Sequence, residues 1–410
     1  MNVLVLTSRP IGSRHNGYDL RVANLCAHIP GALHLVIAPL GHPDGGEQTL
    51  STDGLFDSVD LLEPVGGSHK QPLRHLRLTN DRFLELSFPR QFAAARDRLR
   101  AIARHHQVSR VVVFGGNLAE LAATLHHPYV IVDVCDSVAL TARREIEFGA
   151  DRLSGRHLWV ARLELRRWRA TEGRLPRRFR QVTTISGPDT RELETLAGPG
   201  SNVLTVPNGV DAAFLGPLTA TPRRRGVVFW GNLAFGPNDE ALRFFVNDVY
   251  RPMLRSAGVE FCIIGPNAPR WLTDLAAIDK GVVLLGYVPD LRACVTRYPL
   301  MVNPMRTGSG LKNKVLEAFA LGLAVVSTPL GVQALPQVRG GIHVLEAEDG
   351  RSFGHGVLDL LANEQRRLAL RAASNSLVHQ HYRWEVIGAT WQALFDDDRC
   401  AVDRSLRKGM

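Results

Sequence analysis

Short apolar runs alternate with longer stretches of helical periodicity along the sequence, and the alternation occurs in two rounds. Strands that alternate with helices form a parallel sheet, because each helix returns the chain to the edge where the previous strand began. The runs expected to be strands are 3–6, 33–38, 110–114, 129–134, 181–185 and 202–206, then 226–230, 259–264, 282–285, 300–303, 324–327 and 342–345. The sequence therefore predicts an α/β protein with two facing, doubly wound, Rossmann-like domains.

A segment rich in proline, glycine and arginine, Phe214–Gly226, separates the two rounds and has the composition of a linker. A chain of 410 residues is also long for a single core. We place the domains at residues 1–215 and 222–380, with a C-terminal segment at 381–410. Helices of the second domain are expected to begin near Asn238, Arg270, Asp290, Leu311 and Asp349. In such folds, ligands bind at the carboxyl ends of the strands.

The net charge of +9 indicates anionic partners. Aromatic residues make up only 7% and do not interleave with the basic runs, so nucleotide phosphates or an anionic membrane surface fit better than nucleic acid. The five cysteines are scattered and show no metal-ligand spacing. No basic leader precedes the apolar start of Met1–Arg9, and no stretch is apolar enough to span a membrane. A cytoplasmic protein without a bound metal is expected.

The most informative segment is Gly308–Ala320, which follows a predicted strand and opens a helix. Gly308 and Gly310 allow the backbone to approach a ligand closely, and the helix end offers N–H groups and a positive dipole to a phosphate. Lys312 and Lys314 add charge there. The chain has only five lysines, so two within three positions favour a phosphate site. Glu317 is placed to reach a hydroxyl group.

The alternative for this segment is an ordinary amphipathic helix whose lysines are solvated. It is less favoured, because positive charge at the start of a helix opposes the helix dipole. Three other strand exits in the second domain also carry glycine: Gly231–Asp239, Gly265, and Gly286–Asp290, where the backbone at Val288 could bracket a nucleobase. Each alone is typical of a plain turn. Together they favour a nucleotide site, with Gly231 and Asn232 beside the diphosphate.

In the first domain, Gly17 follows the first strand, with Asp19 and Arg21 close behind it in a helix. We expect these three residues to face a substrate. Asp133 and Asp136 end another strand, where they either pair as acid and base or Asp136 caps the following helix. The cap is the favoured interpretation, because aspartate is common at that position.

The stretch Arg156–Arg180 holds nine arginines against two glutamates, interrupted by leucine and tryptophan. It indicates either a solvated helix, which we favour, or a basic amphipathic helix that lies on a membrane surface. Pro176 is expected to end any helix there.

Combined, these motifs resemble a GT-B glycosyltransferase of the large retaining family called group 1 or family four, closest to exopolysaccharide-type sugar transferases. The resemblance covers nearly the full length. It is carried by Asn16–Gly17, Val206–Asp211, Pro237–Glu240, Gly286–Asp290, Arg306–Glu317 and Tyr382–Trp384.

The resemblance implies that the second domain binds a nucleotide-sugar donor, with Glu317 on the ribose hydroxyls and Val288 on the base. Arg306, Lys312 and the loop between them are then expected on the diphosphate, where cations and the helix dipole stabilise the leaving group without a metal. The loop residues are Gly308, Ser309, Gly310 and Leu311. On the first domain Gly17 faces the acceptor and Asp136 is a catalytic candidate. The helix at 384–395 is expected to cross back to the first domain.

Two positions depart from the family pattern. Ser309 stands where an acidic residue is usual, and Cys135 stands where a histidine is common, beside the matching Asp136. Both positions touch the donor sugar in the family, so the resemblance leaves the identity of the sugar open.

The function expected is a hexosyltransferase-type enzyme that moves a sugar from a nucleotide sugar, its substrate rather than a cofactor, to an acceptor hydroxyl. The acceptor is a small molecule or a lipid-linked glycan, in glycan or natural-product biosynthesis. A nucleotide-sugar epimerase would need an acid/base cluster that the sequence does not show. A non-catalytic binding protein would lack the basic side chains that bind the phosphate, yet Arg306 and Lys312 are present. A further hypothesis is that Arg156–Arg180 contacts the inner face of the membrane peripherally.

Overall fold

The computed structural model describes residues 1–12, 17–40, 54–66, 80–149, 155–216 and 225–396. The chain forms two compact units, Met1–Pro207 with the segment from Ile387 onward, and Asn208–Val386. The boundary therefore lies ahead of the predicted linker. Asn16, most of that linker (217–224) and the last residues of the chain lie outside the described residues.

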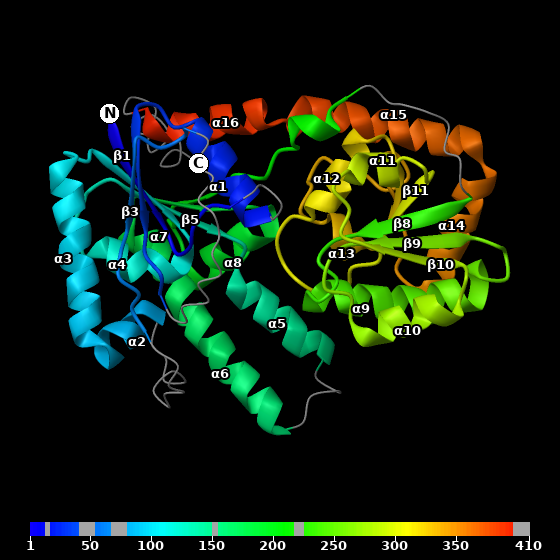
Figure 1. The fold of residues 1–410 in the computed structure, drawn as a ribbon, viewed down its shortest axis with the longest axis horizontal. Coiled ribbons are helices and arrows are strands. Elements are labelled where there is room, and N and C mark those ends of the chain that lie inside the picture. The colour runs from blue at the N-terminus through cyan, green and yellow to red at the C-terminus, as the bar shows by residue number, and fades with distance from the viewer. Residues whose placement is uncertain (13–16, 41–53, 67–79, 150–154, 217–224, 397–410) are drawn as a thin grey trace. The chain divides into compact units, whose positions relative to one another are not determined.

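The first unit is built on a parallel sheet of seven strands in the order β3-β2-β1-β4-β5-β6-β7, with helices on both sides (Figure 1). The strands are β1 (Asn2–Thr7), β2 (Ala32–Ile37), β3 (Ser58–Leu61), β4 (Arg110–Phe114), β5 (Val130–Cys135), β6 (Gln181–Thr184) and β7 (Val203–Thr205). Its helices are α1 (Gly17–Ala27), α2 (Asn80–Ser87), α3 (Pro89–His105), α4 (Ala119–Ala123), α5 (Val138–Gly149), α6 (Gly155–Glu172), α7 (Leu175–Arg178) and α8 (Gly187–Ala197). The helix α16 (Trp384–Gln392) begins in the second unit and ends in the first.

The second unit repeats the design with a six-stranded parallel sheet in the order β10-β9-β8-β11-β12-β13. Its strands are β8 (Gly226–Trp230), β9 (Glu260–Ile264), β10 (Val282–Gly286), β11 (Leu300–Asn303), β12 (Ala324–Ser327) and β13 (Leu345–Glu346). Its helices are α9 (Gly236–Phe244), the π-helix η4 (Phe245–Leu254), α10 (Arg270–Ile278), α11 (Leu291–Val295), α12 (Asn313–Ala320), α13 (Pro329–Val332), α14 (Gly350–Ala362) and α15 (Glu364–His381). The α/β prediction is confirmed.

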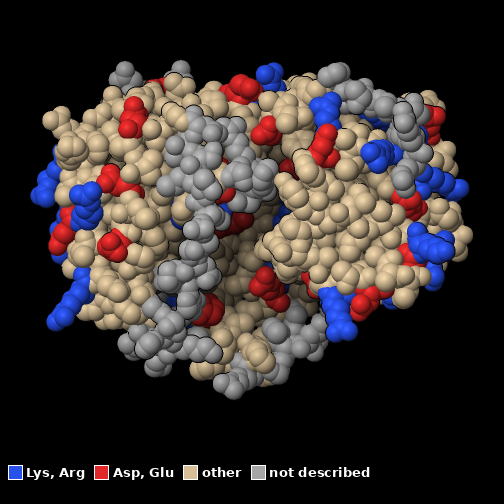
Figure 2. All heavy atoms as spheres, in the orientation of Figure 1, with Lys and Arg blue, Asp and Glu red and all other residues tan. Residues whose placement is uncertain are grey.

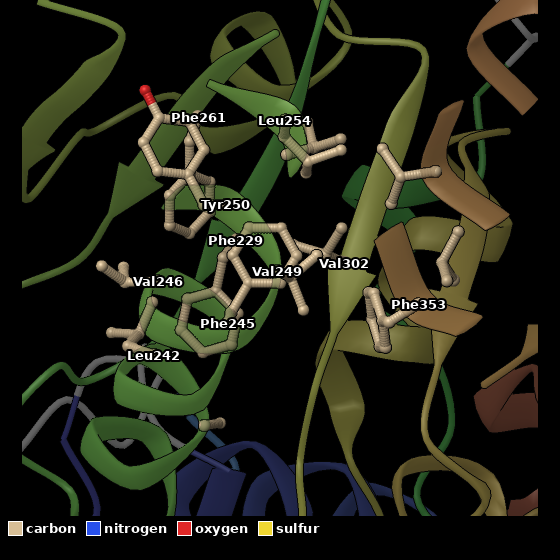
Figure 3. Close-up of a cluster of buried hydrophobic side chains, with 14 of the residues drawn as sticks. Phe229, Leu242, Phe245, Val246, Val249, Tyr250, Leu254, Phe261, Val302 and Phe353 are labelled. Carbon is tan, nitrogen blue, oxygen red and sulfur yellow. The ribbon is translucent and has the colours of Figure 1, made fainter. Parts of the chain in front are cut away.

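An aromatic cluster fixes the elements of the second unit that carry the loops of interest. The ring of Phe245 lies 4.7 Å from that of Phe261 on β9 and 5.7 Å from that of Phe353 on α14, centroid to centroid. Phe229 on β8 is fully buried in the same core (Figure 3). Rings packed this closely hold β8, β9 and the α9–η4 segment in fixed positions.

The strand order of each sheet reverses direction at one place. In the second unit this switch point lies between β8 and β11, and in the first between β1 and β4. Two helices that leave such neighbouring strands go to opposite faces, so a crevice opens at the carboxyl ends of the strands. The glycine-rich turns after β8 and β11 therefore lie at the place where this fold class binds ligands.

Candidate functional site

Two turns of the second unit lie in backbone contact at the carboxyl edge of its sheet. Gly231 and Gly265 both have φ of +150°, and a Cβ added to Gly265 would lie 1.7 Å from the Gly231 carbonyl oxygen. The Gly231 N–H also donates to the Ile264 carbonyl at 3.0 Å. Only glycine fits at position 265. These backbone contacts hold the turns after β8 and β9 together at this edge of the sheet.

The loop that leaves β11 approaches the same place. Gly308 and Gly310 have φ of +90° and +70°, and a Cβ at Gly308 would lie 3.3 Å from Pro237 at the start of α9. The loop ends at Lys312, the N-cap residue of α12, whose side chain makes no capping hydrogen bond. The first amides of α12 therefore present the positive end of the helix dipole to an anion.

The two lysines differ in environment. The Lys312 ammonium donates to the Ser309 carbonyl, within the loop. The Lys314 ammonium donates to Asn238 Oδ1 at 2.7 Å and lies 4.1 Å from the centre of the Phe229 ring. Burial, with help from the Lys312 charge, lowers the pKa of Lys314 to about 7, although Glu317 opposes the shift. The alternative of two solvated lysines therefore does not describe Lys314.

Glu317 lies further along α12 and faces β8. Its Oε2 accepts a hydrogen bond from the Trp230 indole at 2.7 Å. Burial raises the pKa of this carboxyl, and the Trp230 indole and the Lys314 charge partly offset the rise. The start of α12 is also held from the 206–211 motif, since Asn208 donates to Asn313 Oδ1 at 3.1 Å.

Arg306 has a partner that sequence reasoning missed. Its Nε donates to Glu240 Oε1 at 3.0 Å, and its guanidinium lies 4.0 Å from the centre of the Phe244 ring. Both partners belong to α9. The guanidinium is thus fixed by an ion pair and a cation–π contact before any ligand binds. The sequence motif Pro237–Glu240 could have indicated this ion pair, because it contains the Glu240 carboxylate that Arg306 contacts.

The remaining second-unit candidates also lie at this edge. Val288 is half-buried after the positive-φ turn at Gly286, and the Gly286 carbonyl accepts from the Gly265 N–H at 2.8 Å. Ser309 is buried in the loop after β11. The structure therefore brings the turns after β8, β9, β10 and β11 together with the start of α12.

In the first unit, Arg21 and Asp133 form a buried pair instead of facing a substrate. Arg21 donates to the two Asp133 oxygens at 2.6 and 2.8 Å and to the Val206 carbonyl at 2.8 Å. Thr183 donates to the same carboxylate at 2.6 Å. Both members of the pair are 1% exposed. Neither an acceptor contact by Arg21 nor acid–base pairing of Asp133 with Asp136 fits this arrangement.

Asp19 is likewise buried, where it accepts from Arg9 at 3.2 Å and from the Gly12 N–H at 3.3 Å. Helix α1 is buried on all sides in this stretch, since the five consecutive residues Asp19–Ala23 are all buried, and both charged side chains therefore lie inside the unit. Gly17, the first residue of α1, is exposed.

Replacement of Arg21 by methionine is expected to lower the free energy of unfolding by about 3–5 kcal/mol, because it leaves the Asp133 carboxylate buried without its cation. Urea denaturation at pH 7.5 measures the change. The double variant Arg21→Met with Asp133→Leu should recover most of the loss. Equal stability of the Arg21→Met variant and the wild type would contradict the account of the buried pair.

The residue that caps α5 is Ser137, not Asp136. The Leu140 N–H donates to Ser137 Oγ at 3.0 Å, as a helix N-cap requires. Asp136, one residue earlier, is exposed at the carboxyl end of β5. Cys135 before it has φ of +63°, a left-handed conformation that is uncommon for a residue with a side chain.

The arginine-rich stretch forms α6 and α7. Helix α6 ends at Glu172 and Pro176 lies at the start of α7, so Pro176 begins a helix rather than ending one. One stripe of α6 is exposed and combines tryptophan with arginine: Trp159, Arg162, Arg166 and Arg169. Elsewhere, on the face shown in Figure 2, basic and acidic side chains are interspersed over the described surface of each unit.

Within the described ranges, no group of three or more histidine, cysteine or carboxylate side chains could hold a metal ion. Among the helices described, none is long and apolar enough to cross a membrane.

Residues 224–363 match the family model for glycosyl transferases group 1. Among solved structures, Alr3699/HepE of Anabaena, in complex with UDP, is 13% identical with a TM-score of 0.64, over 95% of this chain and 98% of that chain. Sucrose-phosphate synthase from Thermosynechococcus elongatus is 12% identical with a TM-score of 0.71, over 98% and 100%. A glycosyltransferase from Rickettsia africae is 10% identical with a TM-score of 0.63, over 97% and 99%. No curated protein sequence is significantly similar.

The matched model spans the whole of the sheet from β8 to β13 and with it the loop and helix that carry Arg306, Lys312 and Glu317. The structural likenesses extend over both units and concern the fold. Residues 224–363 are therefore similar to the glycosyl transferases group 1, and the chain as a whole has the GT-B fold.

Proposed function

We propose that this enzyme transfers a hexose from a nucleotide-sugar donor to an acceptor hydroxyl, with retention of the anomeric configuration. The observation that carries the donor assignment is the start of α12, where an uncapped helix end, two positive-φ glycines and Lys312 converge. The complexes of the Anabaena protein with UDP and with UDP-glucose support it. The transfer breaks the bond between the sugar C1 and the diphosphate oxygen and joins C1 to the acceptor oxygen, while the proton of the acceptor hydroxyl leaves with the released diphosphate.

Each part of the donor has a partner in the proposal. Glu317 accepts from the ribose hydroxyls, and the backbone at Val288 contacts the base. Lys312, Arg306 and the α12 amides bind the diphosphate. Negative charge grows on that diphosphate as the bond to C1 breaks, so fixed positive charge at this point lowers the barrier. These groups supply the charge in the proposal, and neither a metal nor a cofactor takes part in it.

The first unit is proposed to hold the acceptor near Gly17, with the exposed Asp136 carboxylate in contact with the reacting substrates. The acceptor is a small molecule or a lipid-linked glycan, in glycan or natural-product biosynthesis. The stripe of α6 that combines Trp159 with three arginines supports peripheral contact with an anionic membrane on its cytoplasmic face. Ser309 and Cys135 are the positions at which we expect donor choice to differ from that of the wider family.

Thermal-shift measurements with UDP, GDP, dTDP and ADP test the donor assignment. A nucleotide at 100 times its Kd adds about 2.7 kcal/mol of stability. For a domain of this size that raises the Tm by roughly 5–10 °C. Release of the matching nucleoside diphosphate from a nucleotide sugar then tests transfer to water. Binding without turnover of any donor would favour a non-catalytic binding protein, and conversion of the sugar without cleavage would favour an epimerase.

The lowered pKa of Lys314 predicts a pH dependence of nucleotide binding. A bound diphosphate favours the charged ammonium, so the pKa of Lys314 rises on binding. Below pH 7 the ammonium is charged with or without ligand. Above pH 7, binding must take up a proton, so the affinity falls by up to about tenfold per pH unit.

Titration calorimetry between pH 7.5 and 9, in buffers of different ionisation enthalpy, measures this proton uptake. The Lys314→Met variant should bind the nucleotide without it. Undiminished proton uptake by the variant would assign the effect to another group.

A further inference from the structure

A buried carboxylate, Glu172, holds the turn that presents Asp136. Glu172 is the last residue of α6 and is 2% exposed. Its Oε1 accepts from the Val138 N–H at 2.7 Å and the Ala139 N–H at 3.3 Å, and its Oε2 accepts from Ser137 Oγ at 2.6 Å. These donors form the first turn of α5, directly after Asp136.

A second buried carboxylate completes the arrangement. Asp189 on α8 accepts from the Ser137 N–H at 2.9 Å. Together with the Ser137 hydroxyl, which accepts from the Leu140 N–H, the two carboxylates satisfy every amide at the start of α5. The turn at 135–137, with its left-handed Cys135, is thus fixed by partners 35 and 52 residues further along the chain.

We propose that Glu172 is a positioning residue: with Asp189 it fixes the turn at 135–137 and so sets where the Asp136 carboxylate stands at the carboxyl edge of the first sheet. The inference rests on the proposed function, because it takes Asp136 to contact the reacting substrates. Glu172 itself lies beneath the surface and acts only through the turn.

The ionisation of Glu172 supports this role. Burial raises its pKa to about 7, although the Ser137 hydroxyl and the two amides oppose the rise and the Asp189 charge adds to it. Around this pair lie Cys135 on β5 and Arg144 on α5, and Arg167 pairs with Glu164 on α6. The folded pKa lies above the ordinary value of 4.5, so stability falls as pH rises from about 4.5 to 7. A carboxylate that costs stability when ionised is better explained by function than by folding.

The test compares wild type, Glu172→Gln and the control Glu194→Gln, which changes an exposed glutamate on α8. The measurement is nucleoside diphosphate release from the donor between pH 5.5 and 9. The wild type should lose kcat below a midpoint near pH 7. The Glu172→Gln variant should be about tenfold slower at pH 8, without that midpoint, with an unchanged donor KM and a Tm no lower than that of wild type. A Glu172→Gln variant with the wild-type rate and pH profile would overturn the inference, as would a control with the same defect.

Amide NMR gives an independent measure. The Val138 and Ala139 resonances should titrate with a midpoint near pH 7 in the wild type and not in Glu172→Gln, and their failure to titrate in the wild type would also overturn the inference. If the proposed function is wrong, the result is a different one: the wild type neither binds a nucleotide nor cleaves any donor. In that case the amide titration alone decides whether Glu172 holds the turn.

Discussion

Replacing Lys312 with alanine is expected to lower kcat/KM for the donor about 100-fold or more while the protein stays folded. The ammonium stands at the N-cap of α12 beside the amides that we assign to the diphosphate. Its charge stabilises the leaving group more in the transition state than in the bound donor, so the loss should appear mainly in kcat. Rates of nucleoside diphosphate release, measured over a range of donor concentrations, separate kcat from KM.

Lys280 offers the matched control, because it is an exposed lysine of the same unit in the turn before β10. The Lys280→Ala variant should keep wild-type rates. The folding of both variants can be compared by circular dichroism and Tm. A Lys312→Ala variant that turns over donor at a near-normal rate would remove the diphosphate assignment.

Replacing Glu317 with glutamine is expected to weaken binding of a nucleoside diphosphate by roughly 10–100-fold, because a hydrogen bond to a charged acceptor is worth about 1.5–3 kcal/mol. The loss should be confined to ligands with a ribose. Titration calorimetry with UDP, its 2′-deoxy analogue and pyrophosphate separates the contributions. The wild type should prefer the ribose form, and the variant should bind the ribose and deoxyribose forms alike. Pyrophosphate should bind both proteins equally.

Trp230→Phe is the control for this variant, since it removes the indole donor to Glu317 and leaves the carboxylate in place. It should retain the preference for ribose. A Glu317→Gln variant that still discriminates between the ribose and deoxyribose forms would place the hydroxyls on another residue.

Much of the fold could be predicted because buried parallel strands are short apolar runs bounded by turn residues. The runs 226–230, 300–303 and 324–327 match β8, β11 and β12. Strand β3 was missed, because its residues alternate between half-buried and exposed and include Asp60. Strand β13 has only two residues, too few for periodicity to show its limits.

In the candidate site, too, some features could be predicted from the sequence and others could not. Positive-φ glycines and a helix start follow from local sequence, so the loop at 308–312 was predictable. The partners of the charged side chains could not be predicted from the local sequence. Arg306 pairs with Glu240 across 66 residues and Arg21 with Asp133 across 112. Such pairs depend on which strands become neighbours, and that order is a property of the whole sheet.

Titration calorimetry of the wild type and Lys312→Ala with UDP, GDP, dTDP and ADP tests the donor site most directly. The account predicts that at least one of these nucleotides binds the wild type with a stoichiometry of one and that Lys312→Ala binds it at least about tenfold more weakly. Absence of binding by the wild type to all four, or equal binding by the variant, would contradict it.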